Sequence, residues 1–94
     1  MFDIRRTESG DILMSGRLDA SQADKARSVL RTIEGSCVID FTDLEYISSL
    51  GLGVLLEAQK RLMDAGTSLR LRNLNEHLHE VFHLAGFDTV FEIE

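Results

Sequence analysis

The alternation of apolar and polar residues along the chain predicts β-strands separated by amphipathic helices. Five short segments have the composition or the alternation of strands: residues 2–7, 12–18, 37–41, 69–72 and 90–93. The first two are joined by Glu8-Ser9-Gly10-Asp11, a connection rich in turn-forming residues. We therefore expect the chain to begin with a β-hairpin.

A first helix is predicted directly behind this hairpin. Its apolar residues recur at helical spacing, namely Ala23, Ala26, Leu30 and Ile33. Asp19 stands where an N-cap belongs, and Gln22 follows three residues later, as in a capping box. We expect Asp19 to cap this helix and Gly35 to end it.

A second helix is predicted to reach about Ala65, where Gly66 closes it. A third is expected to begin after Asn75 and to carry four apolar residues: Leu78, Val81, Phe82 and Ala85. Gly86 then occupies the position of a left-handed residue after the helix, which brings Phe87 within reach of Phe82.

The predicted order of elements, β-β-α-β-α-β-α-β, defines the fold class. Parallel strands joined through helices need right-handed crossovers, whereas the first two strands pair as a hairpin. We expect residues 1–94 to form a single α/β domain with a mixed, mostly parallel sheet and an antiparallel N-terminal hairpin. The helices should lie mainly on one face.

The most informative segment is Tyr46–Leu56, which joins the end of a strand to the second helix. Open α/β sheets place their sites at this end of the strands. Ser49 lies where unpaired backbone N–H groups and the helix dipole favour a negative charge such as a phosphate. Serine is also a common helix cap at such a place. Capping alone and modification are therefore both open interpretations of Ser49.

The second helix is too apolar for a helix that only covers a core. Its apolar positions span roughly 200° of the helical circumference, whereas a core stripe needs little more than about 100°. They are Leu52, Val54, Leu55, Leu56, Ala58, Leu62, Met63 and Ala65, interrupted by Gln59. Leu50 falls on the polar side. We expect some of Leu50, Leu52 and Leu56 to form an exposed apolar contact surface beside Ser49.

Composition narrows the classes of function. The 94 residues include 16 acidic and 10 basic ones, for a formal net charge of −6. This balance argues against nucleic acid and anionic membranes as partners and favours a protein partner. No apolar run approaches the roughly 20 residues that span a bilayer, and the single cysteine, Cys37, cannot form an internal disulfide. The expected location is the cytoplasm.

Residues that could carry catalysis are few. His79 and His83 share the spacing of metal ligands on a helix, but no third ligand is evident. Cys37 lies on a buried-looking strand without an activating base, and Asp40 and Asp43 suit a turn better than a nucleotide site. The glycines form no phosphate-binding motif. We expect no enzyme activity, no cofactor and no metal.

Four segments resemble the STAS domain of bacterial anti-sigma factor antagonists. They are Gly16-Arg17-Leu18-Asp19, Val38-Ile39-Asp40-Phe41, Tyr46-Ile47-Ser48-Ser49-Leu50-Gly51-Leu52 and Gly86-Phe87. The resemblance covers essentially the whole chain. In that family a serine or threonine just before the Gly-Leu element is phosphorylated, and here that position is Ser49. Ser48 stands where the family often has Asp and is the minor alternative.

The resemblance implies a partner-switching role. The unphosphorylated form would bind an anti-sigma factor that is also a serine kinase, phosphorylation at Ser49 would release it, and a PP2C-type serine phosphatase would reverse the modification. We expect the apolar surface beside Ser49 to bind this partner, through Leu50, Gly51, Leu52, Gly53, Leu56 and Glu57. The alternative is a stand-alone STAS subunit docked on the ATPase of an ABC transporter, with no phosphorylation switch.

Overall fold

A five-stranded sheet with the order β1-β2-β3-β4-β5 is the framework of the computed structural model, which describes residues 1–94. Its strands are β1 (Phe2–Arg6), β2 (Ile12–Leu18), β3 (Cys37–Ile47), β4 (Leu69–Arg72) and β5 (Glu92–Ile93). β1 runs antiparallel to β2, and the other neighbouring strands are parallel. The predicted hairpin and the mixed, mostly parallel sheet are confirmed.

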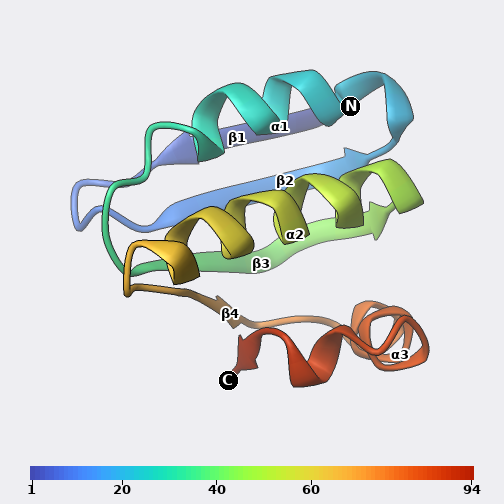
Figure 1. The fold of residues 1–94 in the computed structure, drawn as a ribbon. Helices are drawn as coiled ribbons and strands as arrows, with labels where there is room; N and C mark the ends of the chain where they lie inside the picture. The colour runs from blue at the N-terminus through green and yellow to red at the C-terminus, as the bar shows by residue number, and fades with distance from the viewer.

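Three α-helices connect the strands: α1 (Ala23–Leu30), α2 (Ser49–Asp64) and α3 (Glu76–Leu84). Figure 1 shows α1 and α2 side by side across one face of the sheet, in front of β1, β2 and β3. Two single turns of 3₁₀ helix flank them, η1 (Ala20–Gln22) and η2 (Phe87–Thr89). The predicted element order is confirmed. None of the helices has the length and apolarity that crossing a membrane requires.

Aromatic packing at the C-terminal end joins α3 to the sheet. The ring of Phe82 lies edge-on to those of Phe41, Phe87 and Phe91, with centroids 5.9–6.3 Å apart. Gly86 has the expected left-handed conformation, with a φ of 75°. It turns the chain after α3 so that Phe87 returns to Phe82. Both predictions for this helix end are confirmed.

The predicted ends of the first helix are wrong. Asp19 caps η1 instead of α1, because its carboxylate accepts the Ser21 N–H and closes a tighter turn first. Gln22 makes no capping bond, so the expected capping box does not form. The helix ends at Leu30, well before Gly35. Its last carbonyl is satisfied by Arg61 Nη2 of α2 at 2.9 Å, which removes the need for a glycine terminus.

The third strand is longer than its apolar run predicts. β3 continues past Phe41 to Ile47, eleven residues in all, because it pairs with β2 up to Leu18. Two register shifts against β2 break the alternation of buried residues. Residues 42–45, of which only Leu44 is apolar, therefore lack the pattern of a strand. At the other extreme, β5 is only Glu92–Ile93, shorter than the predicted 90–93.

Gln59 on α2 is the one polar residue among the buried ones, with 2% of its surface exposed. Its side-chain amide donates to the Val90 carbonyl at 2.9 Å, and its side-chain oxygen accepts the Leu69 N–H at 2.7 Å. Gln59, which interrupts the apolar pattern of this helix, therefore links α2 to β4 and to the segment that precedes β5.

We expect Gln59→Met to lower the free energy of unfolding by about 2 kcal/mol or more. The substitution leaves the buried Leu69 N–H and the part-buried Val90 carbonyl without their hydrogen-bond partner. A buried group left unpaired costs about 1–3 kcal/mol, and apolar contact offsets part of the loss. Urea titration followed by circular dichroism measures the change. Lys60→Met, at the exposed neighbouring position, is the matched control and should stay within about 0.5 kcal/mol of the parent. Equal stability of the two variants would contradict the proposed link.

Candidate functional site

The junction of β3 and α2 is held by the backbone and side chain of Ser48. Ser48 Oγ accepts the Gly51 N–H at 3.1 Å, and the Ser48 carbonyl accepts the Leu52 N–H at 2.9 Å. The Ser48 N–H donates to the Leu18 carbonyl at the end of β2, also at 2.9 Å. Ser48 is thus the N-cap of α2 and anchors this helix start to the carboxyl end of the sheet.

Ser49 is the first residue of α2, and its side chain is exposed. None of the side-chain hydrogen bonds within the protein involves its hydroxyl. The sequence left capping and modification open for Ser49. The structure gives the cap to Ser48 and leaves the Ser49 hydroxyl facing solvent.

Gly51 lets α2 approach the strand ends without a side chain between them. A Cβ atom at this position would lie 2.8 Å from Leu18 Cγ and 2.9 Å from Ile47 Cγ1, inside van der Waals contact. Gly53, two residues later and on the exposed side of α2, has open space around it. Of these two predicted site glycines, Gly51 is therefore buried and structural, whereas Gly53 is accessible.

An exposed strip of α2 surrounds Ser49, and we call it the α2 face: Ser49, Leu50, Leu52, Gly53, Leu56 and Glu57. Leu50 is 56% exposed, and Leu52 and Leu56 are half-buried. An apolar surface beside Ser49 is therefore present, and Leu50 is its most exposed side chain. Two more of the apolar positions that the sequence counted in this helix are also exposed: Met63 in the last turn of α2, and Ala65, its C-cap.

The one charged residue of the α2 face, Glu57, is paired with arginines at the end of α1. Glu57 lies 3.4 Å from Arg27 and 3.5 Å from Arg31, so this predicted contact residue takes part in an ion network. The first turn of α2 contains no acidic residue. The positive end of its dipole near Ser49 is therefore not offset by a side chain of that turn.

Two contacts near the junction were missed by the sequence analysis. The Arg17 guanidinium lies 4.3 Å from the centre of the Tyr46 ring, a cation–π contact between β2 and β3. Asp19 accepts a hydrogen bond from the Ser21 hydroxyl at 2.6 Å, which lowers the pKa of its carboxyl. Arg17 and Tyr46 are opposite each other only in the observed strand register, so only that register could have revealed the first contact.

The remaining candidates do not assemble into a site. His79 and His83 are exposed, and His83 Nδ1 lies 2.7 Å from Asp88 Oδ2, which raises the pKa of His83. No group of three His, Cys, Asp or Glu residues is arranged to hold a metal ion. Cys37 is buried, and burial raises the pKa of its thiol.

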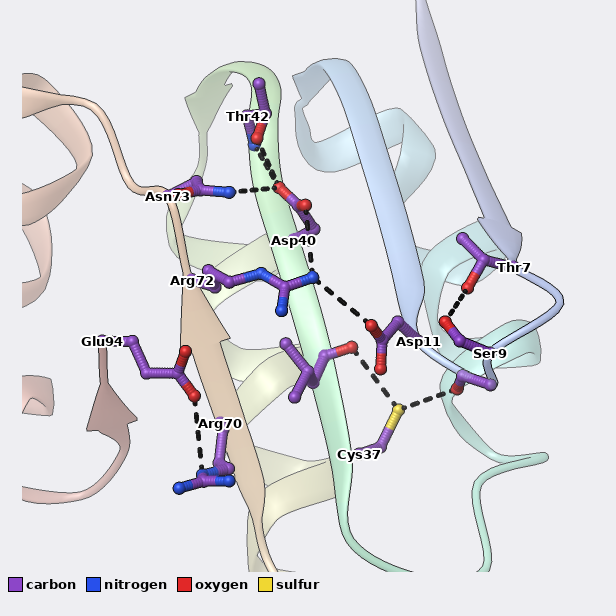
Figure 2. Close-up of polar contacts among 12 residues, drawn as sticks. Thr7, Ser9, Asp11, Cys37, Asp40, Thr42, Arg70, Arg72, Asn73 and Glu94 are labelled. Atoms are coloured by element: carbon purple, nitrogen blue, oxygen red, sulfur yellow. Dashed lines mark hydrogen bonds and ion pairs between the residues drawn. The ribbon is translucent and has the colours of Figure 1, made fainter.

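Asp40 lies on the sheet face opposite α1 and α2, where Figure 2 shows it between Thr42, Asn73 and Arg72. It accepts bonds from the Thr42 hydroxyl at 2.6 Å and the Thr42 N–H at 2.8 Å. Burial alone would raise the pKa of this carboxyl, but the bonds from Thr42 and Asn73 and the charge of Arg72 together lower it. Asp40 therefore closes a local turn within β3, the interpretation that the sequence favoured.

Known proteins match this chain over almost its whole length. A family model described as "Mlab, STAS domain" matches residues 4–93. The anti-sigma-B factor antagonist of Listeria monocytogenes is 34% identical over 94 residues, which cover 96% of this chain and 82% of that protein.

Solved structures give the same picture of the fold. An anti-sigma-factor antagonist (STAS) domain protein from Planctomyces limnophilus superimposes with a TM-score of 0.80, at 24% identity over 100% of this chain and 90% of the other. SpoIIAA in its unphosphorylated form has a TM-score of 0.73, at 17% identity and coverage of 100% and 87%. SpoIIAA of Bacillus in its phosphorylated form has a TM-score of 0.71, at 18% identity and coverage of 100% and 91%.

We expect Ser48→Ala to lower the free energy of unfolding by about 1 kcal/mol, because it removes the side-chain cap of α2. Ser49→Ala removes a hydroxyl that makes no bond within the protein and should stay within about 0.5 kcal/mol of the parent. Thermal and urea unfolding of the two variants measure the difference. A larger loss in Ser49→Ala than in Ser48→Ala would contradict the assignment of the cap.

Proposed function

Because the chain belongs to the STAS domain family of anti-sigma factor antagonists, we propose that it is such an antagonist and that phosphorylation of Ser49 is its switch. The unphosphorylated protein binds an anti-sigma factor that is also a serine kinase. The kinase transfers a phosphoryl group to Ser49, the complex dissociates, and a serine phosphatase of the PP2C type restores the binding form.

The observation that carries this proposal is the different placement of two adjacent serines. Ser48 is half-buried, and its oxygen is engaged as the cap of α2. Ser49 is exposed on the α2 face, in the first turn of the helix, and none of the hydrogen bonds within the protein uses its hydroxyl. A kinase needs an accessible oxygen, and modification of Ser49 leaves the cap in place. These facts favour Ser49 over Ser48 as the acceptor.

The start of α2 is electrostatically suited to a phosphate. Ser48 accepts hydrogen bonds from the N–H groups of Gly51 and Leu52. The N–H groups of Ser49 and Leu50, at the start of the helix, have no acceptor within α2. A negative charge there gains roughly 0.3–1 kcal/mol from the helix dipole. We therefore expect the phosphorylated protein to keep its fold. That SpoIIAA has a related fold in its phosphorylated form supports this expectation.

The negative charge of a phosphate on Ser49 would weaken the binding of a partner protein. A phosphoserine carries about −1.5 to −2 charges at neutral pH, and here it would stand next to the exposed side chain of Leu50. A partner that covers Leu50 must desolvate this charge or be repelled by it, and each 1.4 kcal/mol lost weakens binding about tenfold. Phosphorylation would thus act on the interface with little effect on folding.

The acceptor can be tested by intact-mass measurement after incubation with the cognate kinase and ATP. We expect the parent and Ser48→Ala to gain the mass of one phosphoryl group and Ser49→Ala to gain none, because only Ser49 presents a free hydroxyl on the α2 face. A gain that survives in Ser49→Ala would contradict the proposal. Full biological function of Ser49→Ala would favour a transporter-docking subunit without a switch.

The interface mechanism can be tested with a charge that needs no kinase. We expect Ser49→Asp to weaken binding of the anti-sigma factor at least about tenfold, because the carboxylate lies beside Leu50, while the Tm changes by only a few degrees. Calorimetry measures both quantities. Ser36→Asp adds the same charge at the exposed amino end of β3 and is the matched control. Equal weakening by both variants would point to net charge instead of the α2 face.

A further inference from the structure

The outer edge of β1 has no neighbouring strand. β1 is the first strand in the sheet order and pairs only with β2. The Met1 carbonyl accepts the Arg17 N–H and the Thr7 N–H donates to Asp11, so the odd-numbered residues of this segment face β2. The backbone N–H and C=O groups of successive residues point to opposite sides of an antiparallel strand. Those of Phe2, Ile4 and Arg6 therefore point outward, away from β2. Figure 1 shows α1 in front of this edge strand.

One side chain of α1 reaches this free edge. Lys25 Nζ donates to the outward carbonyl of Phe2 at 3.1 Å, and it lies 3.9 Å from Asp3 Oδ1. The same ammonium group is 5.9 Å from the centre of the Phe2 ring. Lysine on an edge strand is a known obstacle to pairing with another chain, because the incoming strand must displace or bury its charge.

The sequence of β1 is complementary to itself in the antiparallel direction. If Ile4 of two copies lies opposite each other, Phe2 of one copy lies opposite Arg6 of the other, and all outward backbone groups can pair. In this register Asp3 is opposite Arg5 of the second copy. These are non-hydrogen-bonded positions, where opposing side chains are closest, and opposite charges there stabilise the pair.

We propose that β1 is a pairing edge for a second copy of this chain, with Ile4 at the two-fold axis, and that Lys25 weakens this pairing. The contact comprises one strand of five residues from each copy. With so few backbone bonds available, a single ammonium group on one outward carbonyl is enough to shift the balance toward the unpaired form.

Sedimentation equilibrium of the full chain tests this proposal without any partner protein or kinase, so its outcome is separate from that of the phosphorylation switch. We expect Lys25→Ala to lower the dissociation constant of the dimer at least about tenfold relative to the parent. Lys60→Ala removes the other lysine, from the exposed side of α2, and should behave as the parent does. Unchanged self-association of Lys25→Ala would overturn the proposal.

Charge exchange tests the register in the Lys25→Ala background. Adding Arg5→Asp places like charges opposite each other and should reverse the gain in association. Further addition of Asp3→Arg restores opposite charges and should restore the dimer. Hydrogen exchange of the Ile4 and Arg6 amides should slow in the dimer, since both become bonded. If the dissociation constant does not respond to these substitutions, the copies associate through another surface, and the proposed pairing is overturned.

Discussion

The close contact of Gly51 with Leu18 and Ile47 is the constraint on which the arrangement of the candidate site depends. With no side chain at Gly51, the first turn of α2 lies directly on the ends of β2 and β3. The bond from the Ser48 N–H to the Leu18 carbonyl fixes the same point through the backbone. Together these contacts determine which residue begins the helix, and hence that Ser48 turns inward as a cap while Ser49 turns to solvent.

Two adjacent residues of the same type therefore have separate roles at the start of α2. One hydroxyl contributes to folding, and the other is free of any structural task. Such a separation is what a reversible charge modification requires, because a shared role would make binding and stability change together. The paired ions of Glu57 with Arg27 and Arg31 border this region without offsetting the positive helix end.

Local sequence rules predicted much of the fold, and long-range contacts explain the failures. The hairpin, the Asn75 cap and the Gly86 turn each depend on residues close in the chain, and the structure has all three. β3 was predicted too short because its second half follows the register of β2. The exposure of Ser49 could be expected, but the choice between Ser48 and Ser49 as the cap depends on how Gly51 fits against Leu18, about thirty residues away in sequence.

The two anchors of α2 have a consequence for recognition. Its first turn is fixed to β2 and β3, and Gln59 fixes its second half to β4 and to the chain before β5. A helix held at both points is preorganised and has little freedom to tilt. If a partner protein binds at Leu50, as proposed, association would lose less conformational entropy on this side, and a high affinity would need only a small area of contact.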